Sequence, residues 1–161
     1  LKQLCQEFPS IKIVTIGQIS YALKGISSQL TEYKYCQPDE FSNILNSIKN
    51  GIWLIPLDNS LFSSCKSSIK YFHYTSCAIV TIASNVKPYS DDIRNGESGI
   101  LVDNTTECWL NSTKKLIKDP KLRQLILIKA IRTWQNNGSK ETAIRAWKQA
   151  FYGLPKPTLK C

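Results

Sequence analysis

The residues best suited to chemistry in this sequence lie in one polar segment between two apolar runs. One helix is expected to begin at Lys66, and at about 100° per residue Lys66, Lys70 and His73 fall along one narrow stripe of it. Ile69 and Phe72 fall on the adjacent stripe, so we expect these two side chains to be buried. The helix would then present two ammonium groups and an imidazole along an accessible face.

The expected start of this helix is a candidate site for phosphate groups. The first backbone N–H groups of a helix have no partner within the helix, and that end carries partial positive charge. Lys66, Ser67 and Ser68 would lie there. A lysine at this end is unfavourable for the helix itself, and a bound diphosphate would relieve that cost. A plain surface helix with two lysines explains the same spacing, so both interpretations stay open.

Apolar runs alternate with helical patterns along the whole chain, which is typical of a parallel sheet covered by helices on both faces. Strands are expected over 11–16, 30–36, 52–57, 78–83 and 100–102. Helices are expected up to residue 8 and over roughly 38–50, 66–76, 104–118, 120–134 and 139–153, with one helical turn near 88–94. We predict one α/β domain over 1–153, Rossmann-like and three-layered, with or without its first strand. Its mostly parallel sheet should have four to six strands, and 154–161 should be a loose tail.

Polar residues mark three of the expected helix starts. Asn104 with Glu107 is a variant of a capping box, Asp119 precedes Pro120 at a first turn, and Ser139 precedes the last helix. In parallel sheets, ligands bind beyond the carboxyl ends of the strands and beside helix N-termini. The segment around Lys66 is therefore expected at the ligand-binding edge of the sheet.

Length and composition suit one domain of a larger protein. The chain has 161 residues, 42% of them hydrophobic, and no methionine, so we expect it to be part of something longer. No run approaches the roughly 18 to 20 consecutive apolar residues of a membrane helix, and the first eight residues do not look like a signal peptide.

The cysteines are not spaced for a metal site. There are six of them, none in a C-x-x-C pair, and His73 is the single histidine. We therefore expect no bound metal, no disulfide framework, and reduced, mostly buried thiols in a cytoplasmic protein.

Positive charge gathers in the last third of the chain. Residues 110–161 hold 12 Lys or Arg and two acids, whereas residues 1–109 hold nine basic and ten acidic residues. Such asymmetry suggests an anionic partner, although a solvated helical surface accounts for it equally well. The side chains expected on this basic surface are those of Lys114, Lys115, Lys118, Lys121 and Arg123.

The segment of about 52–134 resembles the C-terminal domain of retaining glycosyltransferases of the B-type fold, in the large group 1 family. Four motifs carry the resemblance: DNSLF, then CKSSIKYFHYTSCAIV with TIAS, then NVKPYSDDIRNGESGILVDN, then a helix ending in KDPKLR. The third is similar to the family pattern PYxDxIxxGxxGxLV. No single motif is decisive, but their order along the chain is specific.

The resemblance implies a donor site for a nucleotide sugar. Lys66 and Ser67 match the KS pair that faces the donor diphosphate, and the N–H groups of Ser67 and Ser68 would assist them. Asn59 and Phe62 match the loop before it. The family needs no bound metal or other cofactor for this step.

The chain departs from the family at the donor ribose. His73, with Lys70 nearby, stands where the family has the glutamate that holds the ribose hydroxyls. A glutamate accepts two hydrogen bonds from a diol, and a neutral histidine accepts one. Ala78 and Val80 also replace the family's glycine and proline before the next strand. The donor site is therefore expected to be altered or degenerate.

Two classes of function follow. In the first, the chain is the donor half of an enzyme that transfers a sugar to an acceptor, and it barely turns over without an N-terminal acceptor domain. In the second, it is a non-catalytic binding module whose basic C-terminal third meets an anionic partner. That partner would be an anionic membrane surface at the inner face of the membrane, or a lipid-phosphate acceptor. Nucleic acid is the weakest option, because it rests on charge alone.

Overall fold

Helices and strands alternate along the chain as the sequence predicts. The computed structural model describes residues 1–17, 23 and 28–152, so the predicted tail over 154–161 lies outside the described residues. The elements in chain order are α1 (Lys2–Glu7), β1 (Ile13–Ile16), β2 (Leu30–Tyr33), α2 (Pro38–Ser47), β3 (Ile52–Ile55), α3 (Leu61–Ser64), α4 (Ile69–Ser76), β4 (Val80–Ser84), α5 (Tyr89–Asp92), β5 (Ile100–Val102), α6 (Thr106–Lys118), α7 (Pro120–Thr133), the π-helical turn η2 (Trp134–Gly138) and α8 (Lys140–Tyr152).

The central sheet is parallel and has the strand order β3-β4-β5. Ile52 pairs with Val80 at one end of the β3–β4 ladder and Ile55 with Ala83 at the other, and β5 continues the sheet beyond β4. The prediction that the runs 52–57 and 78–83 are parallel neighbours is confirmed. Their carboxyl ends consequently lie at one edge, where the segment 57–68 follows β3.

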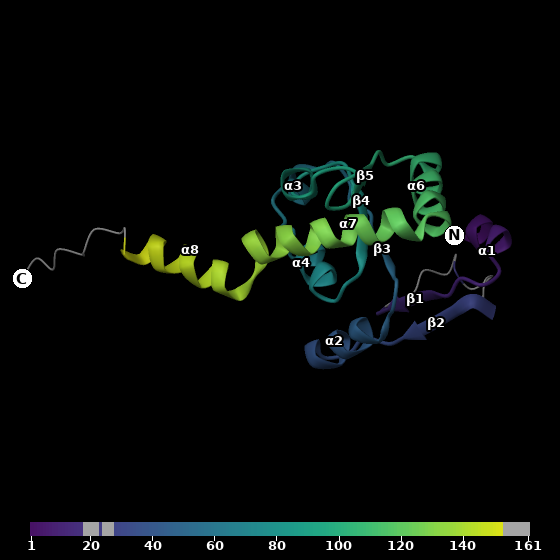
Figure 1. The fold of residues 1–161 in the computed structure, drawn as a ribbon, viewed down its shortest axis with the longest axis horizontal. Coiled ribbons are helices and arrows are strands. Elements are labelled where there is room, and N and C mark those ends of the chain that lie inside the picture. Colours follow the sequence, from purple (N-terminus) through teal and green to yellow (C-terminus); the bar gives the residue numbers. More distant parts are fainter. Residues whose placement is uncertain (18–22, 24–27, 153–161) are drawn as a thin grey trace, which may run out of the picture.

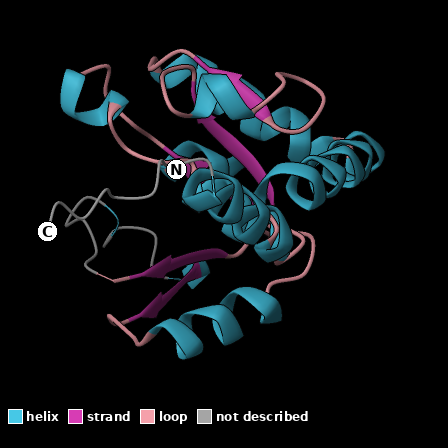
Figure 2. Ribbon diagram, turned by 90° about the vertical axis from the view of Figure 1, so that its left-hand side faces the viewer, coloured by secondary structure: helices cyan, strands magenta, loops and turns pink. Residues whose placement is uncertain are grey.

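The strands do not form one sheet of four to six members, and that prediction is wrong for the described residues. β1 and β2 pair with each other in a separate, parallel, two-stranded sheet, which Figure 2 shows apart from the larger one. Ile16 of β1 still packs against the core shared by β3 and β4. The two sheets are thus linked by side-chain packing and not by backbone hydrogen bonds. The hydrophobic pattern of a sequence does not distinguish these two kinds of contact.

Two hydrophobic clusters lie on opposite faces of the central sheet and make a three-layer domain. Because successive side chains of a strand point to opposite faces, Ala83 of β4 enters one cluster and Ile82 the other. The first cluster contains residues of α2, α4 and α5, and the second contains residues of α6 and α7. The Rossmann-like α/β class is confirmed.

Helix α4 buries a different face from the expected one. Ile69 is 68% exposed and Phe72 is only partly buried, whereas Tyr71 and Tyr74 are buried in the core. The hydroxyl of Tyr71 donates to the carbonyl of Ser98 at 3.0 Å, and burial raises the pKa of Tyr74 to about 12. The aromatic stripe determines the orientation because its rings bury more apolar area, and the Tyr71 hydroxyl finds an acceptor inside the domain.

The C-terminal helices begin close to their expected residues, with one correction. Asp119 caps α7 by accepting from the N–H of Leu122 at 2.9 Å, and Ser139 accepts from the N–H of Thr142 at the start of α8. The predicted capping box is wrong, since Thr105, not Asn104, caps α6. Asn104 is engaged elsewhere, as described below.

Helix α8 extends away from the rest of the domain (Figure 1). None of its residues is buried. Ile144, Trp147 and Phe151 share one side of the helix at helical spacing, and each is at least 44% exposed. Trp147 therefore lies on an exposed apolar side of α8, whereas Trp53 stacks on Tyr74 with 4.0 Å between ring centroids.

The thiols are less buried than predicted. Of the five described cysteines, Cys5 is buried, three are partly buried and Cys65 is exposed, and all five are free. Cys161 lies outside the described residues. No helix in the described part of the chain is long and apolar enough to cross a bilayer.

Candidate functional site

The loop after β3 is held in shape by its own polar groups. The N–H of Ser60 donates to the Asp58 carboxylate at 2.8 Å, and the Ser60 hydroxyl accepts from the N–H of Ser63 at 3.1 Å to cap α3. Hydrogen bonding from Ser60 lowers the pKa of Asp58 to about 2. The predicted loop residues Asn59 and Phe62 lie here and are exposed, Phe62 by 76%.

Lys66 lies in a turn between two short helices, not in the first turn of one long helix. Helix α3 ends at Ser64 and α4 begins at Ile69. The serines account for the break: the Ser64 hydroxyl donates to the carbonyl of Leu61, and such local bonds compete with a continuous helix. The Lys66 ammonium lies 4.9 Å from the centroid of the Phe62 ring, a cation–π contact that brings two predicted site residues together.

Ser67 and Ser68 differ in what they offer a ligand. Ser67 is exposed, whereas Ser68 is 4% exposed and its hydroxyl donates to the carbonyl of Pro88 at 3.2 Å. The Ser68 side chain is therefore a structural link to the segment after β4, whereas the role predicted for Ser68 concerns its backbone N–H. The backbone N–H groups of both serines have no acceptor among the described residues, and they lie in the turn that leads into α4.

His73 contacts α2. Its Nε2 lies 3.5 Å from the Ser42 hydroxyl, and its ring meets the Phe41 ring edge-on at 5.4 Å between centroids. Lys70, one turn earlier on α4, is exposed. No contact joins His73 to Lys66 within the described structure, so the predicted site divides into a Lys66 part and a His73 part.

A hydrogen-bonded triangle that the sequence did not reveal holds the edge of the sheet at the strand ends. The Ser84 hydroxyl accepts from the N–H of Leu57 at 2.8 Å and donates to Asn104 Oδ1 at 2.6 Å. Asn104 Nδ2 returns to the carbonyl of Leu57 at 2.7 Å. The last residue of β4 and residues just beyond β3 and β5 are thereby joined where the Asp58 loop begins. The available signal was a polar residue at the end of each of two apolar runs.

The expected basic surface is partly neutralised by α1. Lys115, Lys118 and Lys121 are exposed as predicted, whereas Lys114 and Arg123 are partly buried. Lys114 and Lys118 both pair with Glu7, and the two ammonium groups lower the pKa of that carboxyl.

Two hollows on the described surface are lined by other residues. One, of about 310 Å³, lies beside β5 and α6, and the other, of about 610 Å³, lies along α8. Neither includes the predicted donor residues. Within residues 1–17, 23 and 28–152, no three His, Cys, Asp or Glu side chains are placed to hold a metal ion.

Comparison with known proteins finds similarity of structure without similarity of sequence. Neither a protein-family model nor a curated protein matches the chain. The HepE protein of Anabaena, solved in complex with UDP, has a TM-score of 0.72 and 12% identity over 95% of this chain and 44% of its own. The C-terminal domain of LpcC from Francisella tularensis, a glycosyl transferase group 1 family protein, has a TM-score of 0.66 and 15% identity over 86% of this chain and 75% of its own. A glycosyltransferase from Rickettsia africae has a TM-score of 0.64 and 13% identity, over 93% and 50% respectively.

The chain thus spans less than half the length of HepE and half that of the Rickettsia enzyme. The three layers and the parallel strands agree with the expected architecture. The chain has the fold of the C-terminal, Rossmann-like domain of B-type glycosyltransferases.

Proposed function

We propose that this chain binds a nucleoside diphosphate sugar and is the donor-binding half of a glycosyltransferase. The observation that carries the proposal is the turn at Lys66. An exposed ammonium, an exposed Ser67 hydroxyl and two backbone N–H groups that have no acceptor in the described part of the chain lie together there, beyond the carboxyl end of β3. Donors of this kind around a helix start suit a diphosphate.

The surroundings of the turn support a preformed site. The Ser84–Asn104–Leu57 triangle fixes the start of the loop, and Ser68 ties its end to Pro88. Groups that are already in place lose less freedom when a ligand binds. In the transfer reaction, negative charge develops on the leaving nucleoside diphosphate, and the same donors would stabilise it.

The acceptor would come from a second domain. Helix α8 has an exposed apolar side that contains Ile144, Trp147 and Phe151. An exposed apolar side of this kind suits a surface that another domain covers. The isolated chain is then a binding domain, and transfer needs both halves.

Calorimetry tests the proposal directly. UDP, GDP and pyrophosphate are titrated into the chain, with dissociation constants expected in the micromolar to millimolar range, or about −4 to −8 kcal/mol. When the chain is incubated with a nucleotide sugar and no acceptor, we expect nucleoside diphosphate to be released no faster than in buffer without the chain. Absence of binding below about 10 mM for all three compounds would remove the proposed function.

His73→Glu is expected to strengthen UDP binding about two- to tenfold, the usual value of one added hydrogen bond, while pyrophosphate binding stays the same. Position 73 already lies within 3.5 Å of the Ser42 hydroxyl in a half-buried setting, and a carboxylate there accepts both ribose hydroxyls. His73→Gln is the matched control, because it has the same length as glutamate without the charge. An equal gain for pyrophosphate would mean that position 73 does not meet the ribose.

One alternative function keeps specific support. Lys115, Lys118 and Lys121 are exposed near the junction of α6 and α7, which suits a non-catalytic module that binds an anionic membrane surface or a lipid phosphate. Each surface lysine near anionic lipid contributes about 1 kcal/mol. The chain should then co-sediment with anionic vesicles and not with neutral ones, and equal recovery with both would leave only a solvated surface.

A further inference from the structure

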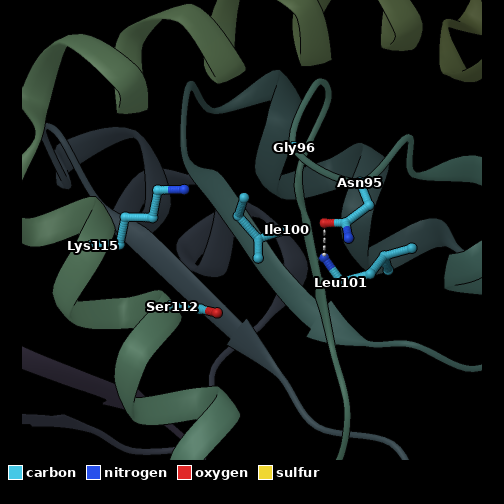
Figure 3. A pocket seen from close by; sticks show the side chains of 6 residues that line it. All are labelled: Asn95, Gly96, Ile100, Leu101, Ser112 and Lys115. Atoms are coloured by element: carbon cyan, nitrogen blue, oxygen red, sulfur yellow. Dashed lines mark hydrogen bonds between the residues drawn. The ribbon is translucent and has the colours of Figure 1, made fainter.

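The hollow of about 310 Å³ beside the edge strand β5 is lined by hydrogen-bond donors on two facing walls and by apolar side chains of β5. It is lined by Asn95, Gly96, Ile100, Leu101, Ser112 and Lys115 (Figure 3). None of these residues is acidic. Its size is at the lower end of ordinary small-molecule sites and well above that of a single phosphate.

The Asn95 amide is oriented by the backbone. Its Oδ1 accepts from the N–H of Leu101 at 3.0 Å, a bond drawn in Figure 3. The amide oxygen is thereby engaged, and Nδ2 has no acceptor among the described residues. Asn95 therefore lines the hollow with an amide whose orientation is fixed by the edge of the sheet, and Nδ2 is the part of that amide left as a donor.

Helix α6 supplies two more donors from the opposite wall. Ser112 and Lys115 are three residues apart, so they share a face of the helix, and Figure 3 shows both on that wall. Lys114 and Lys118 pair with Glu7, but Lys115 has no carboxylate partner in the described structure. Glu97 lies in the turn that also carries Asn95, and its carboxylate lies 4.0 Å from the ammonium of Lys129 on α7, not beside Lys115.

The turn that carries Asn95 is anchored in the core. Ser98 is 1% exposed, its hydroxyl accepts from the N–H of Arg94 at 3.0 Å, and its carbonyl accepts from the buried Tyr71 hydroxyl. The N–H of Gly96 closes the turn on the carbonyl of Gly99 at 2.8 Å. Because these bonds already hold the turn in place, a ligand does not have to order it on binding.

We propose that this hollow binds a small oxyanion-bearing metabolite, with the oxyanion on Lys115, Ser112 and Asn95 Nδ2 and the body of the molecule against Ile100 and Leu101. A phosphate monoester of sugar size fits both the donors and the volume. The site does not rest on the proposed nucleotide site: it flanks β5, whereas Lys66 follows the far strand, β3.

Residue-resolved NMR separates the two sites. Inorganic phosphate and glucose 1-phosphate are titrated into the ¹⁵N-labelled chain at constant ionic strength. Saturable shifts are expected at the amides of Gly96, Leu101 and Ser112, with the ester binding more tightly because it also contacts the apolar wall. The same shifts should persist in Lys66→Ala, which distinguishes this site from the nucleotide site.

Two variants test the donors. Lys115→Ala should weaken binding roughly tenfold, as loss of a charged hydrogen bond predicts, while Lys121→Ala, an exposed lysine on α7, leaves it unchanged. Asn95→Asp keeps an acceptor for Leu101 but replaces the donor with a negative charge, and should abolish binding. Linear, non-saturating shifts for both ligands, or equal affinities for Lys115→Ala and Lys121→Ala, would overturn the proposal.

Discussion

Replacing Lys66 with alanine is expected to weaken UDP binding by about ten- to hundredfold, which corresponds to the loss of a charge-assisted hydrogen bond of about 1.5 to 3 kcal/mol. Lys66 is exposed and makes no ion pair within the described structure, where its ammonium rests over the Phe62 ring. It can therefore move to a phosphate without breaking a salt bridge. Calorimetric titration of the wild type and the variant measures the difference.

The control for this prediction is Lys49→Ala. Lys49 is exposed and precedes β3, so it lies at the amino end of the same parallel sheet, away from the Lys66 turn. The loss at Lys66 should also shrink as salt concentration rises, because exposed charges are screened. If both variants bind UDP as the wild type does, the diphosphate lies elsewhere and Lys66 is wrongly assigned.

The order of elements and the ligand edge could be predicted from the sequence because both depend on local patterns. The runs 52–57 and 78–83 are apolar enough to be buried strands, and they pair in parallel. Asp119 and Ser139 mark the starts of α7 and α8 because each accepts a hydrogen bond from a backbone N–H three residues later. These features need only a few neighbouring residues to be read correctly.

Features that depend on distant contacts could not be predicted. Asn104 follows a strand and precedes a helix, so a capping role was the natural expectation, yet its amide bonds Leu57, 47 residues earlier. The face that α4 buries was likewise ambiguous, because Tyr71 and Tyr74 compete with Ile69 for the core. Packing against Ser98 and Trp53 decides the outcome, and neither partner is near in sequence.

The division of the Lys66 segment into two helices is an intermediate case. The sequence shows the serines of this segment. Their effect on the helix depends on whether each hydroxyl bonds the nearby backbone or a ligand. Ser60 and Ser64 bond locally and Ser68 bonds Pro88, whereas Ser67 is exposed and has no side-chain partner among the residues that the structure describes. The phosphate prediction keeps its donors after this correction, but they now lie on a turn.

Leu116→Ala is expected to lower the free energy of unfolding by about 2 to 5 kcal/mol, the range for a buried leucine whose removal leaves a cavity. Leu116 is fully buried between α6 and the sheet, in a cluster with Val80, Ile82 and Ile126. The side chains around the cavity are fixed on strands or on a helix, so little collapse can offset the loss. Denaturant unfolding followed by circular dichroism gives the value.

Leu125→Ala makes the same chemical change at an exposed position, so comparison with Leu116→Ala isolates the effect of burial. Leu125 lies on α7 and is 59% exposed, so Leu125→Ala should change the unfolding free energy by less than about 0.5 kcal/mol. The Lys66 turn belongs to the opposite face of the sheet, where α4 packs, and folded Leu116→Ala should therefore bind UDP with wild-type affinity. Equal destabilisation by the two variants would mean that α6 does not pack on the sheet through Leu116, and a selective loss of UDP binding would mean that the two faces are coupled.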